Sequence, residues 1–348
     1  MNKHLPLIVG ASATVILAAG YFGLSAYSSK QAQKHLEDWV YEVSLDEKLS
    51  WRSVSASPFG GSVSIRDVEL ELGKNEPALR AAELIISERI SDENQSRLRL
   101  QLKGIEADTS AINGLRGLGA LASRNIDREL ARASHNFEPA LSSGLATLKP
   151  FDLELFVDVD DDAGTVEAEI AIALPELFDS RMSYSLSKQR DLNRKLKRLE
   201  DDLDGEDNPY RLIAKLQELT GSIERAELAN VRVSLQDRGM LERSIALYQR
   251  YNTPLDPTAG SADSQRSEHY TKMVERTVKN CQRESKDLPK SMDNSCDLLE
   301  DVLMEKVSGI VLSIEPTESV RLSDLAKLDN ARQGKRVLER LNPELESL

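Results

Sequence analysis

Carboxylates between positions 158 and 169 come closest to a metal-binding pattern in this sequence. Asp158, Asp160 and Asp162 recur at every second position, and Glu169 lies eleven positions after the first of them. Oxygen ligands of calcium loops have this spacing. However, Ala163 occupies the position at which such a loop needs glycine, and the flanking residues alternate as in strands rather than helices. We therefore predict an ordinary acidic turn without metal, and a metal site formed by these four carboxylates is the alternative.

The two cysteines, Cys281 and Cys296, are the next candidates for chemistry. Zinc needs further ligands, and no histidine stands near them at ligand spacing. The surrounding sequence predicts helices at 270–286 and 291–307, broken near Pro289. An antiparallel hairpin of these helices would bring the thiols together as a disulfide, and two separate buried thiols are the alternative. A disulfide implies an oxidising compartment such as a bacterial periplasm.

The remaining reactive groups do not form a catalytic pattern. Histidines stand only at positions 4, 35, 135 and 269, so none can be assigned as the base for a serine or cysteine nucleophile. The run at 117–122 imitates a dinucleotide-binding fingerprint, but a helical stretch precedes it where a strand is required. We expect no catalytic residue, no cofactor and no enzyme activity. A hydrolase that uses an unseen pair among the 58 acidic residues is the alternative.

A basic block directly precedes an acidic one in the middle of the chain. The basic residues of this block are Lys188, Arg190, Arg194, Lys195, Lys197 and Arg198. Acidic residues dominate 200–207, whereas a helix prefers acids at its N-terminus and bases at its C-terminus. This order indicates either contact with an acidic protein or lipid headgroups, or a solvated helical hairpin that neutralises its own charges.

Composition narrows the class of partner. The net charge is −13, and aromatic residues make up only 5% of the chain. Such a surface repels phosphate backbones at long range and offers few rings on which bases could stack. We therefore predict no nucleic-acid partner, while the 40% of hydrophobic residues is enough to fill a large core.

The first 30 residues contain the longest uncharged stretch, from Leu5 to Tyr27. A helix of that length crosses the roughly 30 Å hydrocarbon core of a bilayer. The stretch exceeds an ordinary signal-peptide core, so we predict an uncleaved signal anchor; a cleaved signal at Ala18-Ala19-Gly20 is an alternative. The positive charges on the two sides of this stretch are nearly equal in number, so they do not decide its orientation. The short N-terminal tail, and the cysteines that favour export, predict an N-terminus inside the cell.

Alternating apolar residues predict strands along much of the remaining chain. The expected strands cover 50–57, 63–72, 84–90, 98–105, 151–159, 165–174, 182–186, 223–235 and 310–314. The strands at 151–159 and 165–174 form the clearest hairpin, since an Asp-Asp-Ala-Gly turn joins them. Helical spacing appears instead at 188–203 and 210–221, which Pro209 separates.

These elements predict an α+β fold, in which an N-terminal transmembrane helix precedes a curved, mostly antiparallel β-sheet with inserted helical hairpins. The expected divisions are a cytoplasmic tip and transmembrane anchor at 1–28, an amphipathic helical stalk at 29–47, a periplasmic domain at 48–325 and a C-terminal helix or tail at 326–348. The helical insertions are expected near 109–148, 188–221 and 265–307.

Three stretches resemble the AsmA/YdgA-like group of proteobacterial envelope proteins. They are Val54 to Leu72 with its Phe59-Gly60-Gly61 turn, Ile223 to Tyr248 with Gln236-Asp-Arg-Gly-Met240, and Ile310 to Leu325. With the anchor they cover about a third of the chain. The short length and the insertions at 109–148 and 188–221 depart from the group's pattern, so no functional residue is transferred.

The resemblance implies a protein of the bacterial inner membrane whose bulk lies in the periplasm and whose curved sheet shelters acyl chains. The expected function is therefore non-enzymatic binding or shielding of lipid or another hydrophobic ligand. The alternative is an envelope scaffold or regulator that acts through its helical hairpins. The expected partners are the lipid bilayer and either a lipid ligand or an envelope protein.

Overall fold

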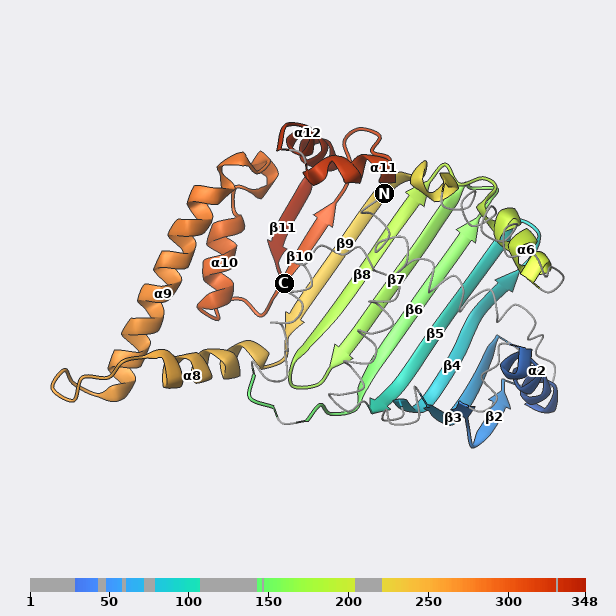
Figure 1. The fold of residues 1–348 in the computed structure, drawn as a ribbon, viewed down its shortest axis with the longest axis horizontal. Coiled ribbons are helices and arrows are strands. Elements are labelled where there is room, and N and C mark those ends of the chain that lie inside the picture. The colour runs from blue at the N-terminus through green and yellow to red at the C-terminus, as the bar shows by residue number, and fades with distance from the viewer. Residues whose placement is uncertain are drawn as a thin grey trace.

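A single antiparallel sheet dominates the structure, a computed structural model that describes residues 29–42, 48–57, 61–71, 79–106, 143–145, 147–203, 221–329 and 331–348. The sheet has 11 strands in this part of the chain (Figure 1). They are β1 (Leu49–Ser50), β2 (Ser53–Ala56), β3 (Ser62–Leu70), β4 (Leu79–Ser91), β5 (Gln95–Glu106), β6 (Phe151–Asp160), β7 (Thr165–Leu174), β8 (Phe178–Ser187), β9 (Glu227–Asp237), β10 (Gly309–Ile314) and β11 (Pro343–Ser347).

Strands that follow one another in the sequence are neighbours in the sheet from β3 to β11. β1 and β2 both pair with β3 at one edge, and β11 pairs with β10 at the other. The hairpin of β6 and β7 confirms the turn expected at 161–164. Gly164 adopts a φ of 69° there, and an added Cβ would lie 2.9 Å from Arg190 Cγ. Any other residue would therefore have a strained backbone and a steric clash at this position.

The two faces of the sheet differ in composition because side chains alternate along each strand. On one face, β6 places Leu153, Leu155, Val157 and Val159, and their partners on β7 are Ile172, Ile170, Ala168 and Val166. On the other face, the same strands place mainly charged and small residues. The hydrophobic effect therefore directs the helices to the first face, which we call the apolar face.

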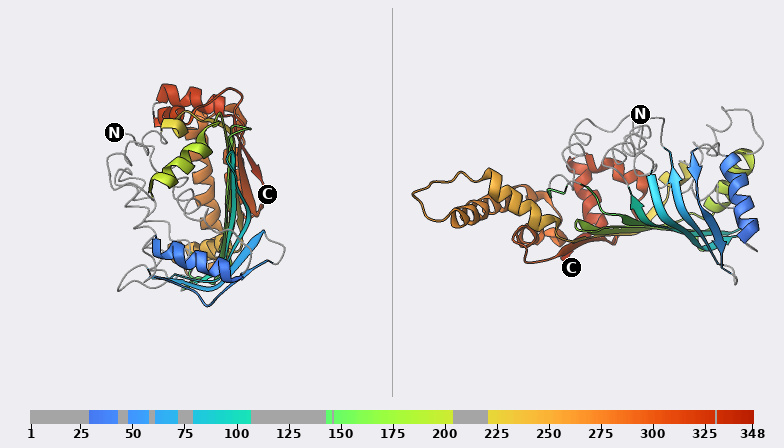
Figure 2. Two further views of the ribbon diagram at one scale, coloured as in Figure 1. Left: turned by 90° about the vertical axis from the view of Figure 1, so that its right-hand side faces the viewer. Right: turned by 90° about the horizontal axis from the view of Figure 1, so that it is seen from below.

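Seven α-helices accompany the sheet in the described ranges. They are α2 (Ser29–Glu42), α6 (Leu192–Leu203), α8 (Met240–Asn252), α9 (Ala262–Glu284), α10 (Ser295–Leu303), α11 (Leu322–Leu325) and α12 (Ala331–Leu341). Figure 2 shows α2, α6 and α12 on one side of the sheet. Helices α8, α9 and α10 extend beyond the β11 edge, and we call them the arm.

Three buried clusters hold helices against the apolar face. Leu36 and Val40 of α2 pack on β3, β4 and β5, so the helix expected as a stalk lies on the sheet. Leu192 of α6 and Val337 of α12 pack over one end of the central strands. A third cluster, which includes Phe151, fills the opposite end.

The arm has a hydrophobic core of its own. Ile245 of α8 packs with Tyr270, Val274 and Val278 of α9, and no strand residue belongs to this cluster among the described residues. Cys281 and Cys296 form a disulfide with Cα atoms 5.7 Å apart, which confirms the pairing expected from the sequence. The arm touches the sheet at its edge, where the Asn294 side-chain amide donates to the Leu345 carbonyl over 2.9 Å.

The expected fold class requires a correction, because the described residues form a large antiparallel sheet with several helices, and a membrane-spanning helix is not among them. None of the helices in the described ranges is both long and apolar enough to cross a bilayer. The longest, α9 with 23 residues, is interrupted by charged residues such as Lys272, Glu275 and Arg276. The stretch from 5 to 27, for which we predicted such a helix, lies outside the described residues.

Other differences concern where elements begin and end. We expected a C-terminal helix or tail at 326–348, but α12 ends at Leu341 and a strand, β11, completes the sheet. Asn342 has a φ of 48° and Pro343 lacks a backbone N–H, so the helix cannot continue. The strand expected from 223 begins only at Glu227, because residues 221–224 are helical. Helix α8 was not expected at all.

Candidate functional site

The predicted metal candidates lie at one end of the β6–β7 hairpin, but each of them has protein partners. Asp158 accepts hydrogen bonds from Arg97 Nε over 3.0 Å and from Gln95 Nε2 over 3.0 Å. Asp160 accepts from the Ala163 backbone N–H over 2.8 Å. The described residues contain no group of three ligands that could hold a metal ion.

The other two candidates are also engaged by protein groups. Asp162 accepts a 3.2 Å hydrogen bond from the Asn94 amide. Glu169 lies 3.2 Å from Arg181 Nη1 on the neighbouring strand. The four carboxylates therefore do not converge on one point, and basic side chains relieve the repulsion that neighbouring strand carboxylates would otherwise suffer.

Arg97 shows how this compensation works. Two of its N–H groups donate to the carboxylate of Asp158, a residue that is only 8% exposed. This hydrogen bond raises the pKa of Arg97 above its ordinary value, against the effect of partial burial. The pair fixes the end of the hairpin against β5 and is structural.

Asp161, which the sequence did not single out, is the most constrained acid of this hairpin. It is 4% exposed and accepts hydrogen bonds from the backbone N–H groups of Asn193 and Arg194, over 2.8 and 3.1 Å. These groups belong to the first turn of α6, whose N–H groups have no helical partners. Asp161 therefore caps α6 from a distant part of the sequence.

Asn193 extends this contact into a buried polar cluster. Its side chain is almost fully buried, accepts a hydrogen bond from Ser96 Oγ and donates to the Glu93 carbonyl over 3.2 Å. Because a buried amide without partners is costly, these contacts fix the position of α6 over the ends of β5 and β6.

The basic block at 188–198 is largely engaged within the molecule. Lys188 contacts Glu227 over 2.6 Å and lowers the pKa of that carboxyl. Arg194 reaches Asp191 over 2.7 Å and Asp161 over 3.5 Å. Lys197 donates to the backbone carbonyl of Asp92. These contacts favour the self-neutralised interpretation over an external partner for this block.

The positions considered for catalysis are not brought together. His269 stacks on Tyr248 with ring centroids 6.4 Å apart in the arm, which is a packing contact. The glycine-containing run at 117–122 and the histidines at 4 and 135 lie outside the described residues. No catalytic assembly can therefore be built from the residues that the structure describes.

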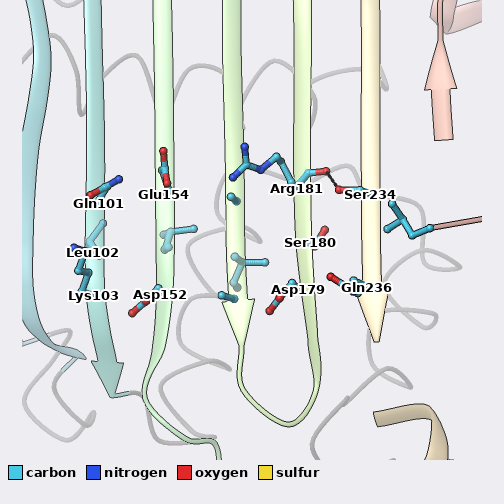
Figure 3. Close-up of a pocket in the computed structure, with 15 residues that line it drawn as sticks. Gln101, Leu102, Lys103, Asp152, Glu154, Asp179, Ser180, Arg181, Ser234 and Gln236 are labelled. Carbon is cyan, nitrogen blue, oxygen red and sulfur yellow. Dashed lines mark hydrogen bonds between the residues drawn. The ribbon is translucent and has the colours of Figure 1, made fainter. Parts of the chain in front are cut away.

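A polar hollow of about 450 Å³ lies on the sheet face opposite the apolar one. Ala171 and Ala173 of β7 form its floor, since their small side chains lie between taller neighbours in register. Figure 3 shows these neighbours: Gln101 and Lys103 on β5, Asp152 and Glu154 on β6, Asp179 and Arg181 on β8, and Ser234 and Gln236 on β9.

The charges around this hollow mostly neutralise one another. Glu154 pairs with Arg99, and Arg238 reaches Asp179 over 2.5 Å. Arg181 is engaged by Glu169 and Asp152 accepts from the Gly104 N–H over 2.8 Å. The hollow is thus a charge-balanced surface, and its groups do not converge on a common ligand position.

The opposite, apolar face carries the feature best suited to a ligand. One residue from each of six strands stands in register across it: Leu155 on β6, Ile170 on β7, Met182 on β8, Val233 on β9, Leu312 on β10 and Leu345 on β11. We call these residues the central row. All six are only partly buried, and none belongs to any of the buried clusters found among the described residues.

The neighbouring row widens this apolar surface on one side. Leu235 and Ile310 are register partners directly beside the central row, and Leu235 is 37% exposed. On the other side, Val231 and Tyr184 pack beneath the helices of the first cluster. The central row therefore lies between two covered ends of the sheet.

Sequence reasoning found five of these six strands, all except β11, but could not identify the row. The residues come from segments 190 positions apart, from Leu155 to Leu345, and only the register aligns them. The usable signal was the alternation itself, which predicts one apolar face per strand. How much of that face the helices leave uncovered is not encoded in the alternation.

Comparison with known proteins gives no independent indication of function. No family model matches the chain, and no curated protein matches it. The resemblance to AsmA/YdgA-like proteins stays a prediction.

Proposed function

We propose that this protein binds or shields a lipid acyl chain on the apolar face of its sheet, without catalysing a reaction. The central row is the single observation that supports this function. A continuous row of partly exposed apolar side chains across six strands is unusual on a folded protein, and such surfaces commonly mark a binding site. Its members offer no hydrogen-bonding side chain, so a ligand would be recognised by apolar area.

The dimensions of the central row suit an acyl chain. Six neighbouring strands at about 4.8 Å spacing give a row about 24 Å long. A bilayer's hydrocarbon core is about 30 Å thick and consists of two leaflets, so one acyl chain extends about 15 Å. One chain laid across the strands would therefore fit within the row.

The disulfide supports a proposal for the compartment. Cys281 and Cys296 are the only cysteines and are bonded to each other. Disulfides persist in oxidising compartments and are rare in the cytosol. We therefore propose that the protein works in an oxidising compartment such as a bacterial periplasm, which is also the location that the resemblance implied.

A pair of adjacent substitutions on β9 tests the proposal. Val233→Asp places a charge in the central row, whereas Ser234→Asp adds the same charge on the opposite face of the same strand. The full chain is purified from cells in mild detergent, and bound lipid is quantified by native mass spectrometry and solvent extraction. We expect stoichiometric lipid in the wild type and in Ser234→Asp, and at least a tenfold reduction in Val233→Asp.

Two outcomes would contradict the proposal. Lipid content that is equal in the two variants would place the ligand elsewhere, and a wild-type protein free of lipid would remove the ligand altogether. Because Val233→Asp could also weaken the sheet, amide hydrogen exchange of β9 is measured alongside, and Val233→Ala serves as a milder variant.

The arm favours a second function, that of a scaffold for another envelope protein. Tyr251 in the last turn of α8 is 73% exposed, and Leu255 in the α8–α9 loop is 46% exposed. Gln265 holds this loop by donating to the Asp256 carbonyl and accepting from its N–H, each over 2.8 Å. A wild type without lipid, together with a partner complex that Tyr251→Asp dissociates, would support this function instead.

A further inference from the structure

A row of basic side chains runs along the outer face of α9 and continues beyond its C-terminal end. Lys272, Arg276, Lys279, Arg283 and Lys286 follow one another at spacings of three and four residues. This spacing puts them on one side of a helix. From Arg276 to Lys286 the row is about 15 Å long at the rise of an α-helix. We call these five residues the basic row.

The basic row faces away from the arm's core. Val274 and Val278 are buried against α8 and α10, and the basic residues occupy the opposite helical positions. Arg276, Lys279, Arg283 and Lys286 are all exposed. A shallow hollow of about 580 Å³ lies among the side chains of these four residues.

The charges of the basic row are mostly unneutralised. Lys272 pairs with Glu268 over 2.5 Å, and Arg283 donates to Asn280. Within the described part of the chain, Arg276, Lys279 and Lys286 make no ion pair with an acid. Glu275 stands three residues after Lys272 and four before Lys279, so one acid lies beside the row, whereas Glu284 lies outside the row's spacing.

The basic block at 188–198 provides the contrast. That block drew attention in the sequence, yet Lys188 and Arg194 are engaged by Glu227, Asp191 and Asp161. Apart from the pair of Lys272 with Glu268, the basic row makes no such ion pair within the residues that the structure describes. On a chain of net charge −13, several adjacent free cations on one exposed face indicate an anionic partner.

We propose that the basic row binds the anionic headgroup surface of a phospholipid bilayer. Anionic phospholipid headgroups raise the affinity about fivefold for each nearby Lys or Arg. The attraction acts within about 10 Å of the membrane, so the distant acidic surface of the sheet does not cancel it. This inference is independent of what the central row binds.

Several features favour a bilayer over an acidic peptide. A peptide site needs shaped walls or a sheet edge that orient the bound chain. The basic row instead lies on a convex helix, and its hollow is open and lined by long, flexible side chains. Mobile headgroups can adjust to such a row, and the hollow has room for a phosphate group among the cations.

Binding of the full chain to vesicles tests the proposal. Vesicles of neutral phosphatidylcholine are compared with vesicles that contain about one third phosphatidylglycerol. The test variant is Lys279→Gln with Lys286→Gln, and the control is Lys103→Gln with Arg232→Gln, which removes the same charge from the open polar face of the sheet. Any binding through the uncharged stretch at 5–27 is common to both vesicle types and cancels in the comparison.

We expect the wild type and the control to bind vesicles with phosphatidylglycerol more tightly than neutral vesicles. In the test variant this gain in affinity should be about thirtyfold smaller. Equal losses in both variants would show a general charge effect and overturn the proposal. Unchanged binding in the test variant would do the same. Displacement of the wild type from vesicles by soluble polyglutamate at equal charge concentration, with tighter binding to the polymer, would identify an acidic protein as the partner.

These outcomes are distinct from those of the lipid-extraction experiment. A protein that carries no acyl chain can still bind the vesicle surface, and a protein with an empty basic row can still retain lipid in its central row.

Discussion

The sheet and the arm of this protein are held together in different ways. The sheet relies on long antiparallel hairpins, three helix-covered clusters and a buried polar cluster at Asp161 and Asn193. The arm has one small cluster around Val274 and the single disulfide of the chain. A small core rarely suffices alone, so a covalent link has greater weight in the arm.

This difference implies that the two regions lose structure separately. The arm contacts the sheet through α10 and the short helix η2 (Lys290–Met292), which meet β11 at the edge, and through Met240 of α8, which packs against the cluster around Phe151. Few buried residues connect the two cores. The proposed activities are divided in the same way, with acyl-chain binding on the sheet and membrane contact on the arm.

Removal of the disulfide should produce the largest difference between the two regions. In Cys281→Ser with Cys296→Ser, we expect the arm to lose about 3 kcal/mol, because the bond closes a loop of 15 residues. Amide hydrogen exchange should accelerate in α9 and α10 and stay unchanged in β6 and β7. Equal acceleration in the sheet would show that arm and sheet unfold as one unit.

Loss of the Asp161 carboxylate should affect the sheet side alone. Asp161→Ala removes the acceptor of two N–H groups in α6, and we expect a loss of about 2 kcal/mol in urea unfolding. The matched control is the neighbouring exposed Asp162→Ala, which should change stability by less than about 0.5 kcal/mol. Similar losses in both variants would argue against the capping role.

High pH should weaken the arm through Tyr270. Burial, Glu305 and Tyr248 raise the pKa of Tyr270 to about 12, and its hydroxyl donates to the Leu303 carbonyl over 2.7 Å. Because the folded-state pKa exceeds the ordinary value near 10, this stabilisation is complete below pH 10 and is lost as pH rises through 12. The expected loss is roughly 1.5 kcal/mol, since solvent screens the Glu305 charge.

Tyr270→Phe provides the control for this pH effect. The variant should be less stable than the wild type at neutral pH and should lack the tyrosine-dependent loss in the arm between pH 10 and 12. Hydrogen exchange in α9 at the two pH values measures both. If wild type and variant respond identically to pH, Tyr270 does not contribute the effect.

Most strands could be predicted from the sequence because their side chains alternate regularly. The hairpin of 151–159 and 165–174 was expected almost at its observed bounds, and so was β10. Alternation failed where context decides the outcome. Helix α8 has apolar positions that suit either a strand or a helix, and the C-terminal strand depends on Pro343 and on pairing with β10.

Candidate sites were harder to predict than elements. Asp158 and Asp160 attracted attention by their spacing, yet the residue that caps α6 is Asp161. Its partner Asn193 lies 32 residues away, and no local pattern indicates that separation. The basic block at 188–198 was noticed because it is contiguous, whereas the basic row of α9 was missed because its members are dispersed through a mixed sequence.

The sequence by itself determined the alternating strands, the order of the hairpins and the one disulfide that its two cysteines could form, because these depend on local periodicity and on a count of two. Whether the two thiols pair was decided by the tertiary structure. Tertiary structure alone decided which charges are neutralised and which apolar residues stay uncovered. Both depend on the distances that strand register and helix packing create between residues far apart in the chain, such as Leu155 and Leu345 in the central row.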